Sequence, residues 1–248
     1  MRLATRTDLP ALTALWQTCF GDPRDEILRF FDLLFGEIFV FLSDSGTSMA
    51  ISMPVFWNSR RAAYLYAVCT APEARGQGQC RTLLREAEAF LRGQGISYAL
   101  LVPASDPLFS FYGSLGYQTT FYQDTHVFSC KKSDISAVSV SADRYALLRR
   151  RYAPEGVQYP DCLLMLQGSY GMLLELPGLG CAAAERTENG WLVRELLSSS
   201  LQQAADAIAA LLHCQSLPAA FPGHTPHGMA KSLDGAPLFP SYLGLSFA

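Results

Sequence analysis

The stretch from Pro72 to Leu84 holds the residues whose types and spacing could do chemistry. It follows an apolar run that indicates a strand, contains Gly76 and Gly78, and leads into a segment with helical spacing of apolar residues. The first N–H groups of a helix have no intrahelical acceptor, and the helix dipole adds positive charge there. Glycine lets the backbone approach a ligand closely. The stretch therefore predicts a phosphate-binding turn.

Three kinds of phosphate-binding turn compete for this stretch. A dinucleotide fingerprint needs a third glycine, and this chain has Arg81 at that place. A Walker A loop needs Gly-Lys-Ser/Thr, which is absent from the stretch. An Arg-x-x-Gly-x-Gly/Ala loop fits better, because Arg75, Gly78 and Cys80 occupy its three positions. That loop is the pyrophosphate loop of one acetyltransferase family.

The chain resembles that family, the GCN5-related N-acetyltransferases (GNAT), in a second phrase as well. Residues 111–117 read FYGSLGY and match the family's FYxxLGF pattern. Pro72-Glu73 before the loop and Leu83-Leu84 after it are also usual there. The resemblance covers roughly residues 1–128. It implies an α+β GNAT fold, in which a central mixed sheet is flanked by helices.

The resemblance further implies acetyl-CoA as the acyl-donor co-substrate. The pantetheine arm is expected to pair with the backbone of Val68 and Thr70, and Ser105 stands where the family usually has asparagine. The pyrophosphate is expected to bind the loop residues Arg75, Gly76, Gln77, Gly78, Gln79, Cys80 and Arg81. Cys80 adds a side chain at a crowded turn, and Ser105 costs one hydrogen bond to pantetheine. Neither departure removes the backbone donors.

Two residues carry the catalytic roles that the resemblance implies. The N–H of Val68 polarises the acetyl carbonyl, as in an oxyanion hole. The Tyr112 hydroxyl protonates the departing CoA thiolate while a primary amine attacks the thioester directly. The alternatives are that Tyr112 only packs, and that Cys69 or Cys80 is a nucleophile; a buried structural cysteine is the simpler reading of both thiols.

No general base follows from the residues. The strand expected over 62–70 carries no acid. Glu26, Glu37, Asp124 and His126 are unranked candidates, and the amine could also arrive deprotonated. In the enhanced intracellular survival group of tandem acetyltransferases, which the predicted two halves resemble in outline, a C-terminal carboxylate lies in the active site. That resemblance makes the Ala248 carboxylate a further candidate.

Composition restricts the class of protein. The chain has 248 residues, a formal net charge of −3, 50% hydrophobic and 17% charged residues. No basic cluster indicates nucleic-acid binding. No apolar run reaches the ~20 residues of a membrane span, and the N-terminus has no signal-peptide pattern. Seven cysteines without metal-ligand spacing predict free thiols in a cytoplasmic protein, and no metal is expected. His224-x-x-His227 is interpreted as part of a Pro/Gly-rich surface loop.

The pattern of elements predicts two halves. Residues 1–132 are expected to form the acetyl-CoA-binding domain, and residues 133–248 a smaller, degenerate GNAT-like α/β half, since hairpin, strand, helix and strand recur in that order. Generic α/β alternation is the alternative. Helices are expected at 8–20, 23–36, 79–92, 107–114, 143–151 and 201–212. Strands are expected at 2–5, 38–43, 48–57, 62–70, 96–102, 117–128, 162–167, 170–176, 181–187, 191–198 and 215–221. The apolar segment 241–248 is expected to dock on the body.

The predicted function is acetyl transfer from acetyl-CoA to the primary amine of a small molecule or peptide. The alternative is a non-catalytic acyl-CoA-binding or sensing module on the same fold; a longer acyl donor is a weaker variant. Tyr112 favours catalysis, and the missing base and Cys80 leave room for sensing. Neither the amine nor the oligomeric state can be read from the sequence.

Overall fold

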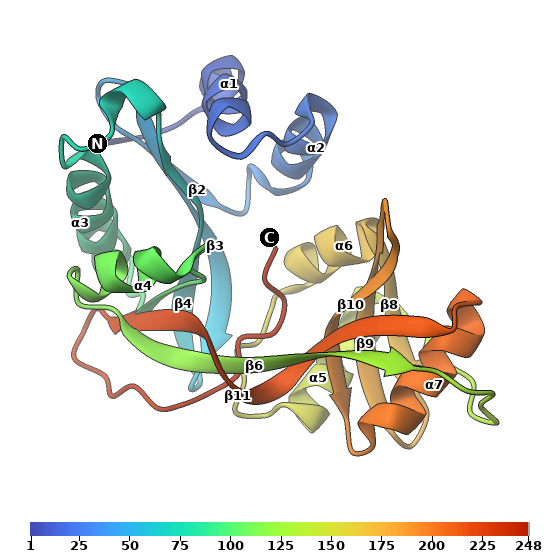
Figure 1. The fold of residues 1–248 in the computed structure, drawn as a ribbon. Helices are drawn as coiled ribbons and strands as arrows, with labels where there is room; N and C mark the ends of the chain where they lie inside the picture. Colours follow the sequence, from blue (N-terminus) through green and yellow to red (C-terminus); the bar gives the residue numbers. More distant parts are fainter. Residues whose placement is uncertain (248) are drawn as a thin grey trace. The chain divides into compact units, whose positions relative to one another are not determined.

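A computed structural model describes residues 1–247 as a mixed α+β fold, in which sheet strands are flanked by helices (Figure 1). The α+β class and the mixed sheet that the resemblance implied are confirmed. The chain separates into two compact units. The first unit joins Met1–Gln118 with Met229–Leu238, and the second joins Thr119–Gly228 with the segment that starts at Phe239. The first half therefore recruits residues from far downstream, and the division of the chain at residue 132 stays a prediction.

The first unit is a six-stranded arrangement in which one pair is parallel. Its elements are β1 (Arg2–Leu3), a 3₁₀ turn (Arg6–Asp8), α1 (Leu9–Phe20), α2 (Arg24–Leu34), β2 (Phe39–Leu42), β3 (Ser48–Trp57), β4 (Arg60–Thr70), a second 3₁₀ turn (Pro72–Ala74), α3 (Gln79–Gly93), β5 (Tyr98–Leu101) and α4 (Asp106–Gly113). The strand order is β1-β2-β3-β4-β5, followed by the last residues of β11 (Ser216–Ser232). Only β4 and β5 run parallel; Met229 to Ser232 of β11 pair antiparallel with β5.

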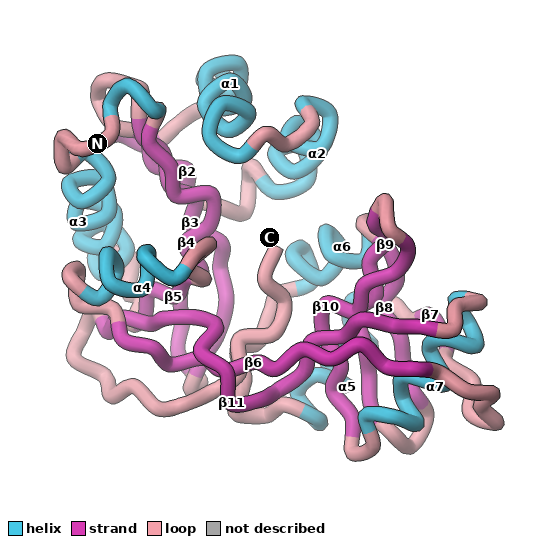
Figure 2. Tube along the Cα trace, in the orientation of Figure 1, coloured by secondary structure: helices cyan, strands magenta, loops and turns pink. Residues whose placement is uncertain are grey.

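Helices cover both faces of this sheet, with α1 and α2 on one face and α3 and α4 on the other (Figures 1 and 2). Alternating residues of a strand point to opposite faces, so both faces of a covered strand must be apolar. On β4, Leu65 packs in the cluster that contains Leu84 of α3. Tyr66 meets Trp16 of α1, with ring centroids 5.6 Å apart. The two helix layers fix β4 from both sides.

The second unit repeats much of that order. Its elements are β6 (Gln118–Ser129), β7 (Val138–Ser139), α5 (Ala142–Tyr152), α6 (Asp161–Ser169), β8 (Gly171–Leu176), β9 (Gly180–Thr187), β10 (Gly190–Ser198), α7 (Leu201–Leu212) and most of β11. The antiparallel run β7-β8-β9-β10 is followed by β11, which pairs parallel with β10. Strand β6 also pairs with β11. In both units a meander is thus followed by a helix and a parallel strand, and the duplication itself stays a prediction.

A buried ion pair fixes the inside of the second unit. Arg149 and Glu195 are both fully buried; Arg149 Nε lies 2.8 Å from Glu195 Oε2 and Nη2 lies 2.8 Å from Oε1. Arg149 Nη2 also donates to the Leu243 carbonyl at 2.9 Å. At Gly244, φ is +83°, and an added Cβ would lie 2.0 Å from Glu195 Oε1. The C-terminal segment is therefore docked through Leu245, as predicted; Ala248 lies outside the described residues.

One predicted element is wrong, and another is a strand, as predicted, but longer than expected. The strand expected over 162–167 is helix α6, in which Leu163, Leu164 and Leu166 are buried. A short apolar run fits a buried helix as well as a strand, and Asp161 in the first turn after Pro160 favours the helix without deciding it. The strand expected over 215–221 continues to Ser232, so His224 and His227 lie in β11 and not in a loop.

Candidate functional site

Two of the residues predicted for the site, Val68 and Thr70, lie where β4 separates from β5. Parallel pairing between these strands covers only Ala62↔Tyr98 through Tyr64↔Leu100. On its other side β4 stays paired with β3 as far as Thr70. One edge of residues 65–70, which include Val68 and Thr70, is therefore without a β5 partner in the described chain. A strand edge without a neighbouring strand can pair with an extended ligand, although the Thr70 carbonyl already accepts from Arg75 Nε at 3.0 Å.

A β-bulge shapes the same stretch. Tyr66 opposes Ile51 and Cys69 opposes Met49, so Ala67 and Val68 together face the single residue Ala50. Ala67 has φ of +47°, a left-handed conformation that costs an alanine roughly 1–3 kcal/mol. A bulge turns the following residues relative to the ladder. The strained backbone at Ala67 therefore sets the direction of the Val68 N–H. The resemblance assigns the oxyanion contact to this N–H.

The glycine-rich turn has the backbone that a diphosphate site needs. Gly76 and Gly78 have φ of +76° and +75°, and an added Cβ at either would meet no atom within 4 Å. Gly78 is the N-cap of α3, and its carbonyl accepts from Thr82 N at 3.0 Å. The amides of Gln79 to Arg81 precede the first intrahelical donor and are available to a ligand. Open space in front of free amides suits an anion.

Side chains of the turn hold the loop in place. Arg75 Nε donates to the Thr70 carbonyl at 3.0 Å and so ties the loop back to the end of β4. Gln79 Oε1 accepts from the hydroxyls of Thr47 and Ser48 on the neighbouring hairpin. Arg81 Nη2 donates to Ser114 Oγ at 3.1 Å, which links α3 to the end of α4. Gln77 and Gly76 are exposed at the tip of the turn. A cavity of about 230 Å³ adjoins it and is lined by Met1, Ser43, Asp44, Ser45, Gln77, Gln79, Thr82, Leu83 and Glu86.

Tyr112 packs in the same cluster as the open strand and the loop. Its ring is 7% exposed, and Val68 and Cys80 pack against its cluster. Within residues 1–247 its hydroxyl has no hydrogen-bond partner. Burial raises the pKa of Tyr112 above its ordinary value, and the neighbouring Cys80 and Cys69 thiols raise it further. The phenol is therefore protonated at neutral pH.

Ser105 lies at the start of α4, and its side chain is not engaged in capping. It is the exposed N-cap residue of α4, and its carbonyl accepts from Leu108 N at 3.0 Å. The hydroxyl makes no capping hydrogen bond. Its predicted contact with pantetheine remains a prediction.

The candidate bases are spread over both units. Glu26 and Glu37 are exposed at the start of α2 and beyond its end, in the first unit. Asp124 of the second unit accepts from Thr225 Oγ1 at 2.7 Å and from the His224 and Thr225 amides, and these contacts lower the pKa of its carboxyl. An acceptor so satisfied is a weak base. His126 is exposed and packs edge-on against Phe128.

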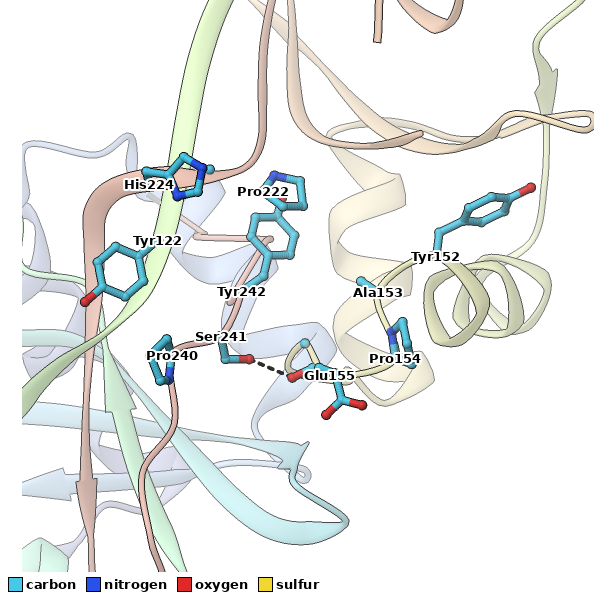
Figure 3. A pocket seen from close by; sticks show the side chains of 12 residues that line it. Tyr122, Tyr152, Ala153, Pro154, Glu155, Pro222, His224, Pro240, Ser241 and Tyr242 are labelled. Carbon is cyan, nitrogen blue, oxygen red and sulfur yellow. Dashed lines mark hydrogen bonds between the residues drawn. The ribbon is translucent and has the colours of Figure 1, made fainter. Parts of the chain in front are cut away.

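The second unit has a cavity of a different character. It measures about 530 Å³ and is lined by Tyr122, Tyr152, Ala153, Pro154, Glu155, Gly156, Pro222, Gly223, His224, Pro240, Ser241 and Tyr242 (Figure 3). Ser241 Oγ donates to the Glu155 carbonyl at 2.6 Å across its rim. Rings of tyrosine and proline with one carboxylate, Glu155, are not the lining of a diphosphate site.

A buried polar cluster near Tyr112 is absent from the sequence-based prediction. Glu88 of α3, Tyr117 and Lys231 meet there, although Lys231 is 143 residues from Glu88 along the chain. One signal for it exists. Glu88 interrupts the apolar stripe of Leu84, Ala87 and Leu91, so the helix pattern places a carboxylate on the core-facing side.

The described part of the chain shows neither a metal site nor a membrane-spanning helix. No group of three or more His, Cys, Asp or Glu residues within 1–247 is arranged to hold a metal ion. No helix among these residues is long and apolar enough to cross a membrane.

Comparison with known proteins identifies the family of residues 1–120. Residues 1–120 match the family model described as an acetyltransferase (GNAT) domain. No protein of curated function matches the chain significantly. With the open strand and the glycine turn, this match shows that residues 1–120 are a GNAT acetyltransferase domain, and the family predicted from the loop and FYGSLGY is confirmed.

Solved structures extend the likeness of fold over the whole chain. A conserved protein of unknown function from Enterococcus faecalis, a probable N-acyltransferase, is 19% identical, with a TM-score of 0.70 over 94% of this chain and 72% of that one. Eis1 from Mycobacterium abscessus is 13% identical, with a TM-score of 0.64 over 94% and 73%. A putative acetyltransferase from Pyrococcus horikoshii is 14% identical, with a TM-score of 0.63 over 100% and 94%. At these identities the likeness is one of fold.

The Cys80 thiol is expected to react slowly with alkylating agents. Burial raises its pKa to about 11 from 9.0, and a raised pKa leaves less thiolate at neutral pH. Two pH units correspond to about 100-fold less thiolate than in a small thiol of pKa 9. The rate of iodoacetamide labelling at Cys80, followed by mass spectrometry, should rise up to about pH 11. An inflection below pH 8 would instead indicate an activated nucleophile.

Proposed function

We propose that the protein is an acetyl-CoA-dependent N-acetyltransferase that transfers the acetyl group directly to a primary amine of a small molecule or peptide. The observation that carries the proposal is the juxtaposition of three parts in one unit: the open edge of β4 after its bulge, the amide turn at Gly78, and Tyr112. The family match supports acyl transfer in general. The donor and the amine are the finer part of the proposal.

The chain's groups divide the reaction between them. The pantetheine arm pairs with β4 at Val68 and Thr70, and the pyrophosphate accepts hydrogen bonds from the amides of residues 76–81, with the positive charge of Arg75 and Arg81 nearby. The amine nitrogen attacks the thioester carbon and forms the C–N bond, while the Val68 N–H stabilises the oxyanion. As the C–S bond breaks, the Tyr112 hydroxyl gives its proton to the sulfur, and the ammonium proton passes to a base or to solvent.

The raised pKa of Tyr112 is compatible with this step. A phenol whose pKa is raised above its ordinary value gives up its proton only to a base of comparable strength. The CoA thiolate forms in the same buried cluster, where desolvation makes it a stronger base than in water. Tyr112 regains its proton from solvent after release of CoA.

We propose one acyl-CoA site per chain, with the second half as a degenerate repeat. Strand β10 also has a bulge, because Val193 opposes Ala184 and Glu195 opposes Ala183. Side chains and the C-terminal segment occupy the space beside β10 after this bulge. Glu195 binds Arg149, and both lie against the C-terminal segment. The turn before α7 is Ser199-Ser200, without the glycines of the first unit. Localisation in the cytoplasm remains part of this proposal.

Calorimetry and a thiol-release assay test the proposal together. Titration of the full chain with CoA should give one site per chain, and acetyl-CoA with a panel of primary amines should release CoA thiol only when a productive amine is present. Two equivalent sites per chain would contradict the degenerate repeat. Tight binding with no turnover on any amine would instead favour a non-catalytic acyl-CoA-binding module, which the absence of an acid on β4 allows.

A further inference from the structure

The cluster of Glu88, Tyr117 and Lys231 has contacts that a plain hydrophobic core does not need. Tyr117 Oη donates to Glu88 Oε1 at 2.8 Å, and Lys231 Nζ donates to Glu88 Oε2 at 2.5 Å. Lys231 Nζ also lies 5.6 Å from the centroid of the Tyr117 ring. Glu88 is 7% exposed and Tyr117 is 3% exposed. The three residues come from α3, the turn after α4 and the end of β11 (Figure 1).

Such a cluster contributes to the fixed placement of its groups more than to stability. Replacing a buried ion pair by apolar residues of similar volume is often neutral or stabilising, whereas removing one partner is costly. What the pair does provide is direction, because both carboxylate oxygens of Glu88 are used and the Tyr117 hydroxyl has a fixed acceptor. Burial, and then the Glu88 carboxylate, raise the pKa of Tyr117, so its hydroxyl remains a donor.

Tyr117 in turn holds Tyr112 at two places. The Tyr117 amide donates to the Tyr112 carbonyl at 3.2 Å, and the Leu115 amide donates to the same carbonyl at 2.9 Å. The two tyrosine rings meet edge to face, with centroids 5.8 Å apart and an interplanar angle of 68°. The Tyr112 hydroxyl itself has no partner in the described chain. Its direction is therefore set by its ring and backbone, and Tyr117 contacts both.

We infer that Glu88 and Lys231 are positioning residues that act through Tyr117 to aim the Tyr112 hydroxyl at the thioester sulfur. The inference rests on the proposed function, because it assigns a task to the same tyrosine. It explains why a lysine from the far end of the chain belongs to the first unit. It also explains why a carboxylate interrupts the apolar stripe of the helix that begins at the phosphate turn.

A double-mutant cycle separates positioning from simple stabilisation. Lys231→Met should lower kcat about tenfold and leave the Kd of CoA within twofold, since the lysine does not line the phosphate turn. Lys231→Arg should keep kcat close to the wild-type value, because a guanidinium can also pair with Glu88. In a Tyr112→Phe background Lys231→Met should change kcat less than twofold, because the group it positions is gone. Lys132→Met, at an exposed lysine, serves as the matched control.

The outcomes distinguish this inference from the proposed function. Equal losses from Lys231→Met in both backgrounds, or no loss while Tyr112→Phe is slow, would overturn the inference and leave the function standing. A wild-type protein that acetylates no amine would overturn the function. In that case fluorotyrosine NMR still decides the inference, with the Tyr112 signal assigned by its disappearance in Tyr112→Phe. Lys231→Met, and Tyr117→Phe as a second variant, should shift or broaden that signal, and an unchanged signal would contradict the positioning role.

Discussion

Gly78→Glu is expected to abolish binding of CoA, with Kd raised about 10³-fold or more. Gly78 is the N-cap of α3 with φ of +75°, and open space lies in front of it. The added carboxylate would point into the space where the pyrophosphate is proposed to bind. Two unit charges about 4 Å apart near a protein surface repel by about 4 kcal/mol at an effective dielectric constant of 20, which corresponds to about 10³ in Kd.

Two variants separate this charge effect from backbone strain. Gly78→Asn introduces an uncharged residue that tolerates the left-handed region, so the Kd of CoA should rise less than about tenfold. Gly21→Glu places the same side chain at φ of +81°, also in open space, at the C-cap of α1, and should leave Kd unchanged. Calorimetry with CoA measures all three proteins. If Gly78→Glu bound as well as Gly78→Asn, the diphosphate would not bind at this turn.

Most of the first unit could be predicted because its signals are local. Pro72, Gly76 and Gly78 define the turn through backbone geometry that few other residues adopt, and the stripe of α3 follows from helical spacing. The bulge at Ala67 carries no such signal, because alanine has no preference for positive φ. The opening of β4 depends on where pairing with β5 stops, and only the folded sheet fixes that point.

Long-range contacts account for what the sequence did not reveal. The return of residues 229–238 to the first unit joins Lys231 to Glu88, and no local pattern near residue 231 indicates that partner. In segment 162–167, which was predicted as a strand, the local pattern itself is ambiguous. Its apolar run is too short for periodicity to separate helix from strand, and packing in the second unit resolves it.

Tyr112→Phe is expected to lower kcat by about 10²-fold or more while the Kd of CoA stays nearly unchanged. The substitution keeps the ring that packs between Phe111 and Tyr117, so the cluster should survive. It removes only the proton that the departing thiolate needs, and general acids typically contribute about 10²–10⁴-fold. Stopped-flow or single-turnover measurement keeps the chemical step in view.

The pH profile gives an independent check of the same assignment. Because burial, followed by the nearby thiols, raises the pKa of Tyr112 above its ordinary value near 10, the acid form persists to higher pH than in a free phenol. Deprotonation of Tyr112 should therefore cause no fall in kcat below about pH 10 in the wild-type protein. If kcat fell above about pH 8 in the wild-type protein but not in Tyr112→Phe, the Tyr112 hydroxyl would ionise in the working range. Tyr112 would then not be the general acid.

A matched control makes the rate effect specific. Tyr152→Phe removes a phenol from α5 in the second unit, where the residue is half-buried, and should leave kcat at the wild-type value. The variant proteins should share the wild-type melting temperature, since neither hydroxyl is a partner in a described hydrogen bond. If Tyr112→Phe turned over at the wild-type rate while chemistry was rate-limiting, the thiolate would depart unprotonated. Tyr112 would then be a packing residue, and the juxtaposition of β4, the amide turn and this ring would support binding of acyl-CoA without the acid step.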